Sequence, residues 1–187
     1  MSVTEQKYEL HMVIQRAAVQ DIDAIDHLMQ EVYAQMEQKD LFVPDDRSFI
    51  ARHIEQEGFT LIAKSQGVIK AFLIIRLPED GTDNLGRHLH LSREELQKVA
   101  HMESAVVHPS CRGQHLQQQL LDLAEQELRK RGYQYLMCTI SPDNTYSLNN
   151  AGRQGYEIMD TLPKYGGKLR SVLCKSLSNK KYRKKEK

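Results

Sequence analysis

The sequence predicts an α/β sandwich built on a mixed β-sheet. Segments with apolar residues at helical spacing alternate along the chain with short runs rich in β-branched residues. The predicted element order is β-α-α-β-β-β-α-β-α-β-β, which is typical of this fold class. The length of 187 residues suits one domain, and we find no internal repeat. We therefore expect one core domain over residues 1–177.

The first half of the chain supplies three strands and two longer helices. The first helix has one apolar face, formed by Ile22, Ile25, Met29, Val32, Tyr33 and Met36. The expected ranges are a strand at 13–16, helices at 21–36 and 44–57, and strands at 59–64 and 68–77. A Ser-Gln-Gly turn between the last two strands indicates a hairpin. Residues 78–98 then interrupt the sheet as an insertion, in which Ser92 and Glu95 form a capping box that predicts a short helix.

The second half alternates strands and helices. A strand over 102–107 leads through a turn to a helix whose apolar stripe is Leu116, Leu120, Leu123, Ala124 and Leu128. That helix ends near Arg131-Gly132. We then expect a strand at 135–140, a helix from Pro142 to Gly155, and two final strands at 156–161 and 168–177.

Composition is that of a soluble globular protein, with 40% apolar and 27% charged residues. The longest apolar runs are too short to cross a bilayer, and the N-terminus lacks a signal pattern, so the expected location is cytoplasmic, away from the membrane. Three widely spaced cysteines predict reduced thiols, and no His, Asp or Glu spacing predicts a metal site. Six of the last eight residues are Lys or Arg. We expect this tail, residues 178–187, to be solvated rather than a nucleic-acid contact.

The turn before the long helix is the most informative segment for chemistry. Pro109 and Gly113 break the chain between the strand and the helix. The free N–H groups and positive dipole end of the helix then converge on one spot, which suits a phosphate or pyrophosphate. Arg112 adds a positive charge there, so the sequence predicts a site for a nucleotide-like cofactor.

The order Val107-His-Pro-Ser-Cys-Arg-Gly-Gln-His-Leu116 resembles the acyl-CoA-binding motif of the GNAT N-acyltransferase superfamily, Gln/Arg-x-x-Gly-x-Gly/Ala. The resemblance implies that Arg112, Gly113, Gln114, His115, Leu116 and Gln117 hold the pyrophosphate of acetyl-CoA. Arg112 and Gly113 match the motif. His115 and Gln117 stand where the family has a glycine and a glycine or alanine.

A second block, Asn144-Thr-Tyr-Ser-Leu-Asn-Asn-Ala-Gly-Arg-Gln-Gly-Tyr156, resembles a later GNAT segment that the family uses beside the cofactor. Asn144 and Ser147 match it and are implied as cofactor contacts. Ala151 replaces the family's usual general acid, a tyrosine, and Tyr146 is the nearby candidate for that role. The resemblance covers roughly residues 11–177 and implies a mostly antiparallel sheet of about seven strands flanked by about four helices.

The implied reaction is direct attack of an amine on the thioester in a ternary complex, without an acyl-enzyme. Backbone amides of Ala105, Val106 and Val107 are implied to hold the pantetheine arm. Glu103 matches the position of a general base, a role that requires burial to raise its carboxylate pKa toward neutrality; the alternative is that Glu103 pairs with a cationic substrate. We expect His101 and His108 to be surface histidines rather than proton relays.

The expected function is therefore an N-acetyltransferase that acts on a primary amine of a small molecule or peptide, as a monomer or homodimer. The acceptor pocket is expected between the first two helices, the 78–98 insertion and the loop 163–167, with Tyr33, Phe49 and Tyr165 as possible walls. Two other classes remain open. A catalytically weak or inactive acyl-CoA-binding regulatory module is suggested by His115, Gln117 and Ala151, and an RNA- or ribosome-associated protein by the basic tail alone.

Overall fold

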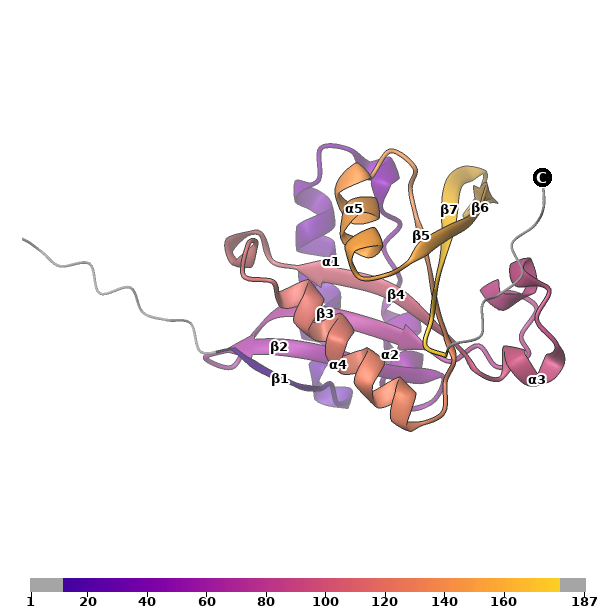
Figure 1. The fold of residues 1–187 in the computed structure, drawn as a ribbon. Coiled ribbons are helices and arrows are strands. Elements are labelled where there is room, and N and C mark those ends of the chain that lie inside the picture. The colour runs from indigo at the N-terminus through magenta and orange to yellow at the C-terminus, as the bar shows by residue number, and fades with distance from the viewer. Residues whose placement is uncertain (1–11, 179–187) are drawn as a thin grey trace, which may run out of the picture.

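A seven-stranded sheet forms the middle layer of the computed structural model, which describes residues 12–178 (Figure 1). The strands lie in the spatial order β1-β2-β3-β4-β5-β7-β6. Every neighbouring pair is antiparallel except β4 and β5, which are parallel. The strand bounds are β1 Val13–Arg16, β2 Gly58–Ser65, β3 Val68–Arg76, β4 Val99–Val107, β5 Tyr135–Ile140, β6 Glu157–Lys164 and β7 Lys168–Ser176. The predicted mixed, mostly antiparallel sheet is confirmed.

Helices cover both faces of this sheet. The α-helices are α1 Ile22–Gln35, α2 Arg47–Glu55, α3 Arg93–Leu96, α4 Leu116–Lys130 and α5 Thr145–Arg153. Short 3-10 turns are η1 Val19–Asp21, η2 Lys39–Leu41, η3 Leu85–Leu89 and η4 Pro109–Cys111. One core packs α1 and α2 against one face, and a second packs α4 against the other. The described residues thus contain five α-helices, which are the four longer ones and the short α3 expected in the insertion.

The apolar stripe of α4 is narrower than the sequence pattern indicates. Leu116, Leu120, Ala124 and Leu128 are all at most 3% exposed and lie in the core beneath the sheet. Leu123 is 41% exposed, so its predicted place on the buried face was wrong. Consecutive helical residues are about 100° apart around the helix axis. The four buried residues are spaced by four along α4, and Leu123 lies at the edge of the face that they form, where solvent reaches it.

The insertion packs against the sheet at the end away from the α4 turn, as Figure 1 shows around α3. Leu85 and Leu89 of η3 join an apolar cluster with Tyr135 of β5 and Val172 of β7. The capping box predicted for Ser92 and Glu95 is confirmed at the start of α3.

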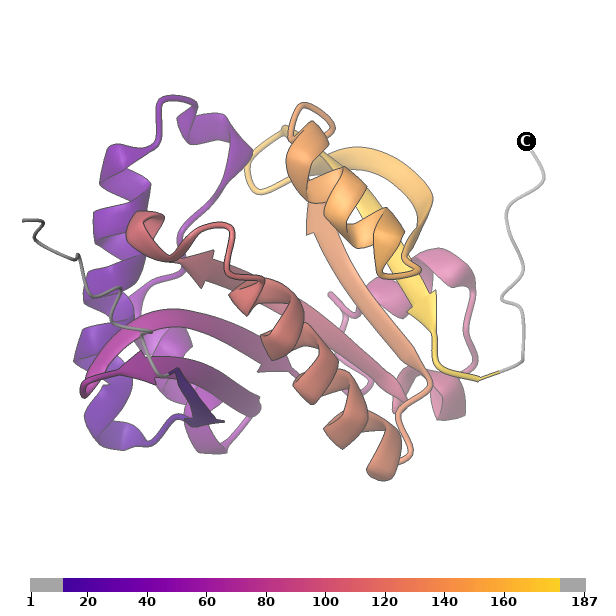
Figure 2. The same cartoon turned by 60° about the vertical axis from the view of Figure 1, so that its left-hand side comes forward.

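The two central strands separate partway along their length. β4 and β5 pair only through Val99–His101 and Tyr135–Met137, and beyond this point they diverge (Figure 2). Between the pairs Leu73 with Ala105 and Ile75 with Met102, β4 contains one more residue than β3, which makes a bulge at Glu103–Ser104. The divergence leaves backbone groups of the second half of β4 without a partner from β5.

Candidate active site

A cavity of about 810 Å³ opens where β4 diverges from β5, between the starts of α4 and α5. It contains ten of the eleven residues that the sequence assigns to the cofactor, Gln114 being the exception: Ala105, Val106, Val107, Arg112, Gly113, His115, Leu116, Gln117, Asn144 and Ser147. Residues from three separate segments are therefore brought together in one cavity. Their role in binding stays a prediction.

The turn that leads into α4 has the backbone shape that an anion site needs. Gly113 has φ +79° and His115, the N-cap of α4, has φ +57°. The first N–H groups of the helix, Leu116 to Gln118, have no carbonyl partner within the helix and belong to residues that line the cavity. His115 keeps the left-handed conformation that glycine adopts more easily, and its side chain is exposed. The residues present therefore fit the pyrophosphate of a coenzyme A cofactor.

The start of α5 completes this cavity. The side-chain oxygen of Asn144 accepts a hydrogen bond from the backbone N–H of Ser147 at 3.0 Å, which caps the helix. Tyr146 lines the same cavity but is 73% exposed. Ala151, at the position where the family motif has a tyrosine, lines a second, smaller cavity instead.

The smaller cavity, of about 290 Å³, continues from the first into the opening between β4 and β5. The two share Ala105, Gln117 and several residues of α5, so they meet beside the end of β4. The segment between α1 and α2, the strand β5 and the turn between β6 and β7 supply the remaining walls. A thioester lying across the junction would face the smaller cavity.

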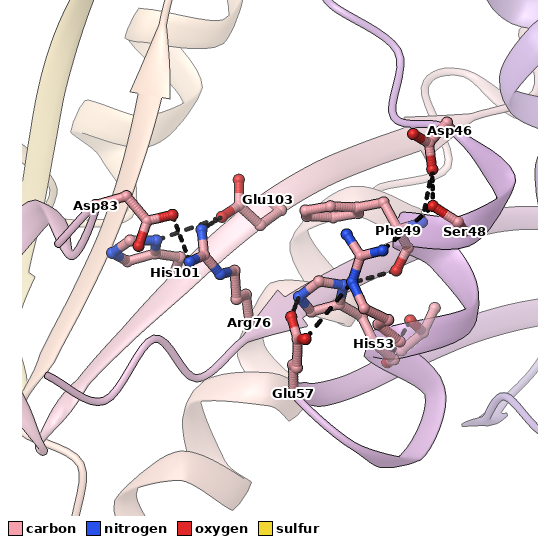
Figure 3. Close-up of polar contacts among 11 residues, drawn as sticks. Asp46, Ser48, Phe49, His53, Glu57, Arg76, Asp83, His101 and Glu103 are labelled. Atoms are coloured by element: carbon pink, nitrogen blue, oxygen red, sulfur yellow. Dashed lines mark hydrogen bonds and ion pairs between the residues drawn. The ribbon is translucent and has the colours of Figure 1, made fainter. Parts of the chain in front are cut away.

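Glu103 lies in this cavity within a network of polar contacts (Figure 3). His101 Nδ1 is 3.3 Å from Glu103 Oε1, and Arg76 reaches the same oxygen at 3.8 Å. Arg76 also pairs with Asp83 at 2.5 Å. Burial favours a raised carboxyl pKa, but the hydrogen bond from His101 and the charge of Arg76 outweigh it, so the pKa of Glu103 is lowered. The raised pKa that the sequence argument required of a base is not found.

His101 is buried, which corrects its assignment as a surface histidine. The residue is 2% exposed, and its Nε2 accepts a hydrogen bond from the Leu85 backbone N–H at 3.0 Å. The proton of a neutral ring must then lie on Nδ1, which faces Glu103. Leu85 and Asp83 both belong to the insertion, so this segment positions the network around Glu103. The insertion does not line either cavity, contrary to the expectation that it forms part of the acceptor pocket.

Asp45 is a second acid in the smaller cavity, one that the sequence analysis did not single out. Its Oδ2 accepts a hydrogen bond from Ser104 Oγ at 2.6 Å. Burial raises the pKa of Asp45 from 3.8 to about 6. The hydrogen bond from Ser104 opposes this rise, and the nearby charges of Glu103 and Asp46 add to it. Asp45 lies just before α2, 59 residues from Ser104. No local sequence signal marks this pair, because the contact forms only when the sheet assembles.

The wall of the smaller cavity that β5 and the turn between β6 and β7 form carries a tyrosine and a cysteine. The Tyr165 hydroxyl lies 3.0 Å from Thr139 Oγ1 on β5, and burial raises its pKa although half of the residue is exposed. Burial and the charge of Glu103 raise the pKa of Cys138 to about 12, so this thiol stays protonated.

Phe49 lines the cavity as expected and stacks on His53 with ring centroids 4.0 Å apart. Tyr33 is in neither set of lining residues; it packs near Phe42 instead.

Within residues 12–178, no group of three or more His, Cys, Asp or Glu side chains is arranged to hold a metal ion. No helix of this described part is long and apolar enough to span a membrane. The basic tail lies almost entirely outside the described residues, so the structure does not bear on its role.

A central sheet opened at one strand pair, with a helix start suited to an anion beside the opening, is the arrangement expected of a protein that binds an acyl-CoA. The model of the acetyltransferase (GNAT) family matches residues 22–156 of the chain. The protein belongs to this family of acetyl-CoA-dependent enzymes.

Several solved structures of other proteins have the same fold as this chain. The ribosomal-protein-S18-alanine N-acetyltransferase from Escherichia coli is 16% identical with a TM-score of 0.67, over 91% of this chain and 97% of that chain. The yncA protein from Salmonella typhimurium, solved with its cofactor acetyl-CoA, is 18% identical with a TM-score of 0.66, over 94% and 99%. A chain of the NatC complex bound to Gag peptide and CoA is 14% identical with a TM-score of 0.68, over 90% of this chain and 99% of that chain. No curated protein matches the sequence significantly.

Proposed function

We propose that the protein transfers the acetyl group of acetyl-CoA to a primary amine of a small molecule or peptide. The observation that supports this most directly is the pair of cavities that meet beside Ala105. One has the residues of a coenzyme A site, and the other contains two carboxylates. An amine in the smaller cavity would therefore lie next to the thioester and next to groups that can bind and deprotonate it.

In the proposed reaction the two acids have different tasks. Glu103, whose pKa is lowered, stays ionised and holds the incoming ammonium group. Asp45, whose pKa is raised to about 6, accepts the proton that the amine must lose before it attacks. This assigns to Glu103 the cation-binding role that the sequence analysis left open, and gives the base to a residue from the α1–α2 segment.

The amine nitrogen then attacks the thioester carbonyl carbon, and the C–S bond breaks as the amide forms. In this proposal backbone N–H groups at the end of β4 polarise the carbonyl oxygen. We assign the proton for the departing thiolate to Tyr165, because this residue lines the smaller cavity and its raised pKa keeps the hydroxyl protonated. Tyr146 is the less suitable donor because it is exposed and lines only the larger cavity. Cys138 is protonated, which favours direct attack over an acyl-cysteine.

The experiment that tests this function measures release of free thiol from acetyl-CoA across a panel of primary amines. We expect acetyl-CoA to raise the melting temperature, because only the native state binds it, and at least one amine to release thiol with formation of the matching amide. Binding of acetyl-CoA without thiol release from any amine would instead identify a regulatory module that has kept the cofactor site. That alternative is suggested by Ala151, which leaves the family's usual position for the general acid without a hydroxyl.

A further inference from the structure

Arg170 is a buried cation in the wall of the smaller cavity. It lies on β7, is 4% exposed and lines the cavity. One terminal nitrogen donates to the carbonyl oxygen of Leu169 and the other to that of Asp40, both at 2.8 Å. These two bonds fix the guanidinium between β7 and the α1–α2 segment. They satisfy two of its five N–H groups and supply no negative charge.

No carboxylate lies within 4.0 Å of Arg170 in the part of the chain that the structure describes. Asp40 is the acid whose pKa Arg170 helps to lower, after the larger effect of Lys168. The Asp40 carboxylate, however, pairs with Lys168 at 2.8 Å and is 90% exposed, so it points to solvent. A buried guanidinium without a counter-charge is costly. Such a group in a cavity wall is suited to an anion that arrives with a ligand.

The same cavity carries the opposite charges that an amine requires. Asp45 and Glu103 line it, from the α1–α2 segment and from β4. Its volume of about 290 Å³ is at the small end of ligand sites, and the acetyl end of the cofactor shares it. Building on the function proposed above, we propose that the acceptor is a small amine that also carries an anionic group, a carboxylate or a phosphate, bound by Arg170.

Matched pairs of acceptors test this inference without any variant. An amino acid and its amide present the same primary amine with and without a negative charge, and phosphoethanolamine and ethanolamine do the same for phosphate. The amide has the less basic amine, so a larger fraction is deprotonated and intrinsic reactivity favours it. We expect the anionic member of at least one pair to have a kcat/KM about 10- to 100-fold higher, the range for a hydrogen bond to a charged group. A series of ω-amino acids then gives the preferred spacing between amine and carboxylate.

The outcomes separate the two proposals. Thiol release with neutral amines used as well as their anionic partners would overturn the role of Arg170 and leave the acetyltransferase function standing. No thiol release with any amine would overturn the function itself.

Arg170→Gln tests the residue directly, because glutamine keeps an N–H donor for the Asp40 carbonyl and loses the charge. We expect the KM of the anionic acceptor to rise about 10- to 100-fold, with the KM of its neutral partner and the acetyl-CoA affinity unchanged. Lys168→Gln is the matched control, since it removes the exposed ion pair with Asp40 and leaves Arg170 in place; we expect it to keep the preference. An equal rise of both KM values in Arg170→Gln would indicate a purely structural role and overturn the inference. If the variant does not fold, the wild-type acceptor pairs decide.

Discussion

Asp45→Asn is expected to make the protein more stable and nearly inactive at pH 8. The Asp45 carboxyl is buried against Ser104, and its pKa is raised from 3.8 to about 6. An acid with a raised pKa in the folded state prefers to be protonated there, so its ionisation favours unfolding. Asparagine keeps an oxygen that can accept the Ser104 hydrogen bond and cannot ionise. The substitution therefore removes the charge while leaving the contact possible.

The size of the effect follows from the pKa. A rise from 3.8 to about 6 corresponds to a destabilisation of about 3 kcal/mol when the group is ionised in both states. This penalty is absent well below the ordinary pKa of 3.8, where both states are protonated, grows up to about pH 6, and is nearly complete above pH 6. Asp45→Asn should therefore exceed the wild type's free energy of unfolding by only about 0.5 kcal/mol near pH 4 and by up to about 3 kcal/mol at pH 8.

Urea unfolding of both proteins from pH 4 to 8 measures this difference, and thiol release measures turnover. Loss of a general base should lower kcat by about 10²- to 10⁴-fold. The neighbouring Asp46→Asn is the control. Hydrogen bonds from Ser48 and the Phe49 backbone lower the pKa of Asp46, so its removal should give no stabilisation above pH 6. An Asp45→Asn protein with the same stability difference at pH 4 and pH 8 would refute the electrostatic argument, and one with turnover within threefold of wild type would refute the base.

Three further substitutions test the remaining assignments. Glu103→Gln should raise the KM of the amine about tenfold with the acetyl-CoA affinity unchanged, because it removes a charge-assisted hydrogen bond; an unchanged KM in steady-state kinetics would contradict the ammonium-binding role. Tyr165→Phe should lower kcat at least about tenfold, whereas the exposed Tyr146→Phe should change it little, and the reverse order would return the acid role to Tyr146. His115→Gly should retain acetyl-CoA binding and raise the free energy of unfolding in urea by up to about 1 kcal/mol, since it relieves a left-handed residue but adds unfolded-state entropy; loss of cofactor affinity would show that the imidazole itself contributes.

The elements of this fold could be predicted because their signals are local. The hairpin between β2 and β3 follows from Gln66 and Gly67, which adopt the positive φ values that a tight turn needs. The capping box of α3 was likewise visible as two residues three apart. The error at Leu123 arose because spacing alone defines a stripe but not its edges; which residues at the edge are buried depends on how the helix is set against the sheet.

The larger cavity was predictable for a related reason. Most of its lining residues come from two continuous motifs, and each motif places its members on one turn and the elements beside it. The smaller cavity is different because its contacts join distant parts of the chain. Asp45 is 59 residues from its partner Ser104, and Arg170 is 130 residues from its partner Asp40. A lone aspartate before a helix reads as a cap and a lone arginine in a strand reads as an edge charge. Their chemistry arises only from burial and from neighbours that the sheet order brings together.

The division of tasks between the two acids depends on those neighbours rather than on the acids themselves. Glu103 faces an imidazole N–H and a guanidinium, both of which favour its ionised form, so it remains an anion over the pH range in which an amine is protonated. Asp45 faces a hydroxyl and other carboxylates, which do not offset its burial to the same degree, so it takes up a proton near pH 6. Environments that drive two carboxyl pKa values apart are how enzymes assign one acid to binding and another to proton transfer. In the proposed mechanism the buried His101, which the insertion orients, therefore helps to keep Glu103 ionised, although neither needs to touch the amine.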